Sequence, residues 1–230
     1  MKLIYGFVNS FFSTNDDMVN QILLIFNKSI ESAQRFHELS IYTDLRTKPL
    51  LSTKVEHTIV DGSYTFLDDL KIELLNSVPY TQIDPDIILY NKLNIDTTYD
   101  ASFDFKQPID NTFTRKLVNN TINCGIESIF PNFSSVNFMP NIGILRIGNQ
   151  KLIDEYTTMY NKLKLFLLNN NLIKIDYSII LGQYLLGYIL MNSNYNVEFV
   201  RFKKNEYIHL SGPQKFNDYF KIPPIDKNII

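Results

Sequence analysis

Short apolar runs alternate with longer segments of helical periodicity along most of the chain. The runs are four to twelve residues long and rich in β-branched and aromatic residues, which is typical of strands. They lie at residues 2–8, 39–45, 55–62, 80–83, 136–147, 196–202 and 206–210. The second run carries two polar residues, Thr43 and Asp44, near its end.

Segments between these runs show apolar positions every three or four residues, which predicts helices. Met18, Ile22 and Phe26 mark the first such segment. Further helices are expected over 63–77, 149–170 and 176–192. Strands alternating with helices predict an α/β fold with a mostly parallel sheet flanked by helices, in which ligands bind at the carboxyl ends of the strands.

Residues 94–135 differ from the rest of the chain. They are rich in Asp, Asn and Thr and show no sustained period. We expect irregular chain with small strands there, forming part of a lid. No linker separates domains, so a single domain over residues 1–230 is the simplest expectation.

Composition narrows the classes of function. The net charge of −2 gives no general basic field, so nucleic acid is not the expected partner. Cys124 is the only cysteine, which excludes an internal disulfide and a thiolate metal cluster and favours a reducing compartment. No apolar stretch reaches the roughly 20 residues of a membrane helix. We therefore expect a soluble protein of the cytoplasm, or of the host cytoplasm if the source is a virus.

Two aspartates, Asp84 and Asp86, follow the run at 80–83 directly and precede another apolar run. Carboxylates in this arrangement can hold a divalent cation that neutralises a diphosphate leaving group. They can equally form a turn in which they accept backbone hydrogen bonds. Apolar residues on both sides favour the metal, because two like charges beside a core need a counter-ion.

A second motif lies near the end of the chain: His209, Gly212 and Lys215 in His-x-x-Gly-x-x-Lys spacing. A neutral imidazole can be a third metal ligand, a glycine lets backbone approach a phosphate closely, and a lysine supplies positive charge. A structural histidine is the alternative.

Together these motifs resemble those of GT-A-fold glycosyltransferases, the nucleotide-diphospho-sugar transferases. "IDPDIIL" is similar to their Asp-x-Asp strand, and "HLSGPQK" to the motif of the family 8 retaining enzymes, the glycogenin and galactosyltransferase group. The resemblance implies a nucleotide-sugar donor, with a UDP-sugar expected first, and Mn²⁺ or Mg²⁺ held by Asp84, Asp86 and His209. It also implies that Lys215 and the Gly212 backbone contact the diphosphate.

The resemblance implies further roles at matching positions. "NIGILRI", with Asn141 and Gly143, is similar to an Asn-x-Gly strand of the family. Nucleotide-sugar contacts are implied for Asn9, Thr43, Asp44, Lys71, Asn141 and Gly143, and Gln183 and Asp176 would line the sugar pocket. The chain departs from the family in Phe216 and Asn217, where Lys-Pro-Trp is usual, and in Pro85. The acceptor, a carbohydrate or a protein, carries no readable signature.

Two other functions fit parts of the pattern. Asp86, Asp104 and Lys106 match the short Pro-Asp…Asp-x-Lys pattern of metal-dependent nucleases, in which two carboxylates bind Mg²⁺. A GT-A-like domain without catalytic activity, serving as a binding module, is the third possibility.

Overall fold

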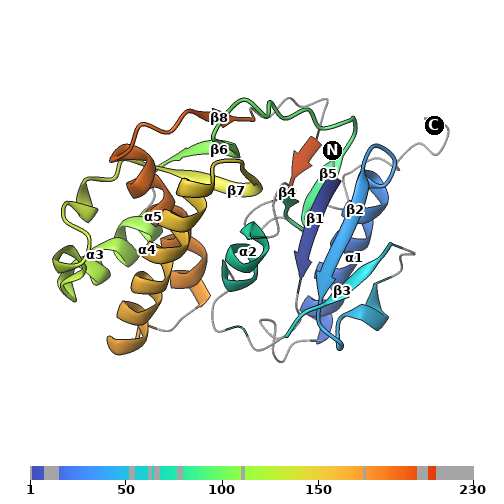
Figure 1. Cartoon of the computed structure of the whole chain (residues 1–230). Helices are drawn as coiled ribbons and strands as arrows, with labels where there is room; N and C mark the ends of the chain where they lie inside the picture. The colour runs from blue at the N-terminus through green and yellow to red at the C-terminus, as the bar shows by residue number, and fades with distance from the viewer. Residues whose placement is uncertain are drawn as a thin grey trace. The chain divides into compact units, whose positions relative to one another are not determined.

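The computed structural model describes residues 2–7, 16–51, 55–61, 64, 68–76, 80–109, 112–172, 175–200 and 207–210, with only the backbone at 16–19 and 175–179 (Figure 1). Its contacts divide the chain into two compact units. The first comprises Met1–Tyr64, Tyr80–Ile95 and Arg201–Ile230, and the second comprises Thr65–Pro79 and Asp96–Val200. The expected single domain over residues 1–230 stays a prediction.

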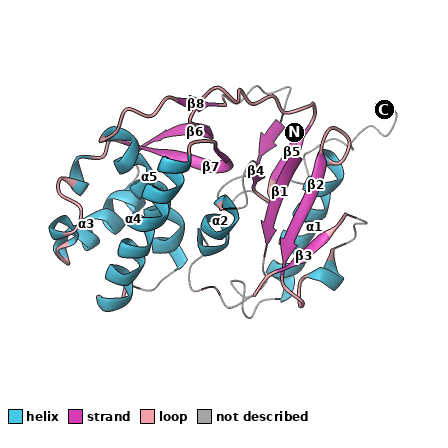
Figure 2. Cartoon of the chain, viewed as in Figure 1, coloured by secondary structure: helices cyan, strands magenta, loops and turns pink. Residues whose placement is uncertain are grey.

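The first unit contains four parallel strands in the order β3-β2-β1-β4 (Figure 2). They are β1 (Lys2–Phe7), β2 (Glu38–Thr43), β3 (His57–Ile59) and β4 (Thr81–Ile83), and helix α1 (Asp16–Ala33) connects the first two. A short 3₁₀ helix, η2 (Lys48–Leu50), follows β2. Two further strands, β5 (Ile87–Leu89) and β9 (Tyr207–His209), form a separate antiparallel pair.

In the second unit β6 (Ala101–Pro108) pairs antiparallel with β7 (Phe138–Ile147) and parallel with β8 (Val197–Phe199). The helices are α2 (Asp68–Leu75), α3 (Thr112–Asn123), α4 (Gln150–Asn169) and α5 (Ile175–Met191), with 3₁₀ turns η3 (Ile126–Ser128) and η4 (Phe133–Ser135). Helix α5 packs on β7 and contacts the other three helices. It approaches β7 so closely that a Cβ at Gly187 would overlap the Phe138 carbonyl oxygen.

The predicted α/β fold with mostly parallel strands flanked by helices is confirmed, and so is the helical periodicity of 149–170. In α4 the residues that recur at helical spacing, Leu152, Tyr156, Tyr160 and Leu163, are all buried. Asn149 begins this helix, its side-chain oxygen accepting the Lys151 and Leu152 amides at 3.0 and 3.4 Å. None of the helices in the described part of the chain is long and apolar enough to cross a bilayer.

The expectation for residues 94–135 was wrong in part, because this segment holds the eight-residue strand β6 and the twelve-residue helix α3. Helix α3 buries polar side chains, which hides its helical periodicity, whereas in β6 the apolar residues Ala101, Phe103 and Phe105 alternate with polar ones, a strand pattern that the expectation overlooked. Thr114 and Thr121 belong to the inward face of α3, and Asp104 is fully buried in β6. A pattern read from apolar residues alone misses such faces.

A partly buried polar contact joins α2 to α4 in the second unit. The Lys164 ammonium lies 2.7 Å from the Asp69 carboxylate, and the Tyr160 hydroxyl donates to the other Asp69 oxygen at 3.3 Å. Burial, and then the negative charges of Asp68 and Asp69, raise the pKa of Tyr160 far above its ordinary value. The tyrosine therefore stays protonated and donates its hydrogen to Asp69. The Asp69 carboxylate thus contacts one ammonium group and one hydroxyl group of the protein.

This contact predicts that Lys164→Ala lowers the free energy of unfolding by about 2 kcal/mol. Breaking a fully buried pair costs roughly 3–5 kcal/mol, and the loss is smaller here because the lysine side chain is 28% exposed. Urea unfolding measures the change. Lys162→Ala, an exposed lysine on the same helix, is the matched control and should stay within about 0.5 kcal/mol of wild type. Equal effects of the two substitutions would contradict the role of the contact.

Candidate metal centre

A β-turn between β4 and β5 holds Asp84 and Asp86, two of the predicted metal ligands. The Ile87 amide donates to the Asp84 carbonyl oxygen at 3.2 Å, closing a four-residue turn over 84–87. Aspartate in the first position and proline in the second are the residues such a turn favours, since Pro85 has a fixed φ. The turn and the cation site, weighed as alternatives in the sequence, are therefore compatible in one segment.

Pairing between β5 and β9 places the histidine beside this turn. Ile87 lies opposite His209 in the antiparallel register, and the Leu210 amide donates to the Asp86 carbonyl oxygen at 2.9 Å. Underneath, Ile25, Ile88 and Leu210 form a small buried cluster. Backbone hydrogen bonds therefore join the two strands to each other, and apolar side chains anchor them to α1.

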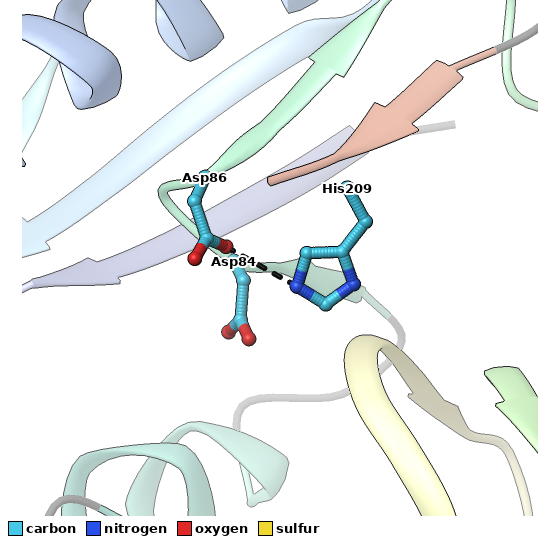
Figure 3. Close-up of side chains that lie close together, drawn as sticks. All are labelled: Asp84, Asp86 and His209. Atoms are coloured by element: carbon cyan, nitrogen blue, oxygen red, sulfur yellow. Dashed lines mark ion pairs between the residues drawn. The ribbon is translucent and has the colours of Figure 1, made fainter. Parts of the chain in front are cut away.

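The three predicted metal ligands converge (Figure 3). One ligand atom from each of Asp84, Asp86 and His209 lies within 4.8 Å of the other two. His209 Nε2 is 3.4 Å from Asp86 Oδ1, with the two side chains 6% and 20% exposed. Both carboxylates and the imidazole point toward a common space between them.

Such a donor set fits a divalent cation. A deprotonated imidazole nitrogen and a carboxylate oxygen are both acceptors, so Nε2 and Oδ1 at this separation need a proton or a metal ion between them. Ligand oxygens about 2.1 Å from Mg²⁺ lie roughly 3–4 Å from one another. Atoms already within 4.8 Å reach that spacing by small side-chain movements. Carboxylates suit Mg²⁺ and Mn²⁺, and one imidazole is compatible with Mn²⁺.

Thr43 and Asp44, predicted to contact the nucleotide, end β2 in the same unit. Asp44 Oδ1 accepts the amides of Arg46 and Thr47 at 3.0 and 2.7 Å, so this carboxylate stabilises the turn that follows β2. Thr43 is fully buried, and its hydroxyl has no hydrogen-bond partner among the described residues. A contact of either residue with a nucleotide stays a prediction.

Lys71, Asn141 and Gly143 lie together in the second unit. The Lys71 ammonium donates to the Ile142 carbonyl oxygen at 3.1 Å, and Asn141 Oδ1 accepts the Gly143 amide at 2.9 Å. The pairing of β6 with β7 changes register at this point, between Phe103 and Phe105. The predicted Asn-x-Gly motif is therefore a local distortion of β7 with a lysine bonded to it.

The remaining predicted residues belong to α5 or lie outside the described residues. Gln183 is partly buried on α5, and Asp176 belongs to the same helix, although its side chain is outside the described residues. Asn9, Gly212 and Lys215 are also outside the described residues. Their roles stay predictions.

The nuclease pattern draws on both units. Asp104 is fully buried and Lys106 exposed on β6, with the lysine ammonium 4.3 Å from the centre of the Phe138 ring. This cation–π contact gives Lys106 a partner within the second unit. Asp86 belongs to the first unit, and a shared nuclease site stays a prediction.

The sequence did not reveal the hydroxyl groups behind the centre. Ser29 and Ser32 of α1 are fully buried and hydrogen-bond to β5. The available signal was two serines three residues apart on an otherwise apolar helix face.

Comparisons with known proteins give structural neighbours only. No model of a known protein family matches the chain, and no curated protein matches it in sequence. The galactosyltransferase LgtC, solved with donor and acceptor sugar analogues, is 10% identical, with 86% of this chain and 73% of LgtC covered and a TM-score of 0.44. Mouse xyloside xylosyltransferase 1 is 11% identical over 86% of this chain and 85% of its own, with a TM-score of 0.46.

The bifunctional glycosyltransferase WbbM is 10% identical, with 86% of this chain and 38% of WbbM covered and a TM-score of 0.40. All three neighbours are glycosyltransferases, the class of protein whose motifs this chain resembles. At these identities and TM-scores the likeness assigns no activity to the chain.

The geometry predicts Mn²⁺ binding that depends on both kinds of ligand. At a Mn²⁺ concentration about 100 times the dissociation constant, the wild-type protein gains roughly 2.7 kcal/mol of stability. Asp86→Asn and His209→Gln should each weaken binding by about 100-fold or more, because outer-shell changes alone cost roughly 10–100-fold. Calorimetric titration measures the affinity. Glu56→Gln, an exposed acid of the same unit, should bind like wild type, and unchanged binding by both ligand variants would contradict the site.

Proposed function

We propose that the chain is a metal-dependent glycosyltransferase that moves a sugar from a nucleotide diphosphate to an acceptor in the cytoplasm. The observation that carries the proposal is the convergence of Asp84, Asp86 and His209 from distant parts of the sequence. It gives the donor set that the motif resemblance implies, on a strand pair supported by a buried core.

The proposed role of the three residues follows from charge. A divalent cation bound there would neutralise negative charge that develops on a departing diphosphate. Asp84 and Asp86 supply two negative charges and balance the cation, whereas His209 in its neutral form adds a ligand without adding charge. The charge of the diphosphate then requires a further cationic group from the chain.

Lys215 is the residue proposed for that charge. It follows His209 by six positions in the motif, and Gly212 between them would let the backbone approach the phosphates. Negative charge on the diphosphate increases as its bond to the sugar breaks, so the attraction between the diphosphate and the lysine ammonium increases too. The lysine would therefore stabilise the transition state more than the bound donor.

The remaining contacts complete the proposal. Asn9, Thr43 and Asp44 would lie at the nucleoside, and Lys71, Asn141 and Gly143 would contact the nucleotide-sugar. Gln183 and Asp176 would line the sugar pocket. A UDP-sugar is the proposed donor, and retention of configuration is proposed from the resemblance of the His-x-x-Gly-x-x-Lys motif. Retention of this kind requires no separate general base for the acceptor.

Donor hydrolysis tests the proposal without knowledge of the acceptor. A screen of UDP-, GDP- and dTDP-sugars with Mn²⁺ should show slow release of nucleoside diphosphate and free sugar, with water replacing the acceptor. Asp86→Ala should reduce turnover by about 10²–10³-fold, the usual loss on removing one electrostatic stabiliser. Lys215→Ala should have a similar effect, and Lys92→Ala, an exposed lysine of the first unit, should have none.

Three outcomes decide between the functions considered. Turnover by Asp86→Ala equal to that of wild type would remove the assignment. Activity on nucleic acid that is lost in Lys106→Ala and kept in His209→Ala would identify a nuclease instead. A non-catalytic module would bind UDP with Mn²⁺, raising its melting temperature, yet release no sugar.

A further inference from the structure

Strand β5 has one edge that β9 does not pair. In an antiparallel pair the backbone groups of successive residues point alternately toward and away from the partner strand. The Asp86 carbonyl oxygen points toward β9, since it accepts the Leu210 amide. The backbone groups of Ile87 and Leu89 consequently point away from β9. Both residues are buried, so these groups need other partners.

The Ile87 amide donates to the Asp84 carbonyl oxygen, and two serine hydroxyls of α1 are the partners of the Ile87 carbonyl and the Leu89 amide. Ser29 donates its hydroxyl hydrogen to the Ile87 carbonyl oxygen, and Ser32 Oγ accepts the Leu89 amide at 2.9 Å. A hydroxyl has a single hydrogen, so Ser29 accepts from Tyr5, whose hydroxyl oxygen is 2.9 Å away. Ser32 likewise donates its own hydrogen to the Ser29 carbonyl oxygen at 2.7 Å. Every hydrogen in this chain of bonds has a defined direction.

Serine at these positions has no other evident use. Both serines are fully buried, on a helix face whose other members are apolar: Ile22, Ile25, Phe26, Ile30 and Ala33. Alanine would favour the helix more and leave no polar group to satisfy. The bonds to β5 explain why hydroxyl groups occur there.

We propose that Ser29 and Ser32 are positioning residues for the metal centre. Their hydroxyls bond to the backbone of β5 as a neighbouring strand would. These bonds fix the position of β5 along α1. Asp86 directly precedes Ile87, and His209 lies opposite Ile87, so two of the three ligands are held through the residue that Ser29 contacts. A slip of one residue would turn the side chains of β5 to the opposite face. This role rests on the proposed function of the centre.

Amide hydrogen exchange and Mn²⁺ titration of the same variants test the role. In Ser32→Ala the Leu89 amide loses its acceptor and should exchange at least about tenfold faster in metal-free protein. Mn²⁺ affinity, measured by water proton relaxation, should fall about tenfold. This is the lower limit of the loss usual when a residue that orients a metal ligand is changed. Ser32→Thr, which keeps the hydroxyl, should recover most of both losses. Ser32→Cys, whose thiol bonds weakly, serves in place of alanine if that variant does not fold.

Thr121→Val is the matched control. Thr121 is also a fully buried helical hydroxyl that donates to the carbonyl three residues earlier, at 2.7 Å, but it lies on α3 in the second unit. Its loss should lower stability and leave the Mn²⁺ affinity unchanged. Folded Ser32 variants that bind Mn²⁺ like wild type would overturn the positioning role alone. A wild-type protein that binds no Mn²⁺ would overturn the proposed function, and the positioning role with it.

Discussion

The pairing of β5 with β9 is the interaction on which the candidate centre depends. Within the described residues it is three residues long on each strand, yet it brings His209 to an acidic turn formed near the middle of the chain. Without it, Asp84 and Asp86 would be two like charges in a turn, with no third ligand. With it, two carboxylate oxygens and one imidazole nitrogen lie within 4.8 Å of one another, and small side-chain movements bring them to the spacing that a divalent cation requires.

So short a strand pair cannot be stable by itself in water. Its inner side rests on Ile25, Ile88 and Leu210, and its free edge is satisfied by Ser29 and Ser32. Apolar burial supplies most of the stabilisation here, whereas the hydroxyl groups determine which residues face which. A metal site needs the second contribution as much as the first, because ligand affinity depends on placement to within fractions of an ångström.

Part of this arrangement could be predicted from the sequence. Asp84 followed by Pro85 has the local preference of a turn, and that preference needs no tertiary information. The periodicity of α4 likewise shows in its own residues. The pairing of Ile87 with His209 is different in kind, since nothing in either short strand encodes its partner. Only the resemblance of the two motifs to a known family indicated that they meet.

The errors have the same physical origin. Helix α3 was missed because Thr114 and Thr121 occupy its inward face. Ser29 and Ser32 were missed for the same reason, as polar residues with partners far along the chain. Buried polar groups are tolerated only where such partners exist, and a local pattern does not reveal the partners.

The most direct test is a crystal structure of the protein with Mn²⁺ and UDP, with anomalous scattering used to locate the ion. The account predicts one Mn²⁺ peak within about 2.3 Å of oxygens from Asp84 and Asp86 and of His209 Nε2, with phosphate oxygens completing the shell. A peak elsewhere, or an ion that contacts the carboxylates while His209 points away, would contradict it.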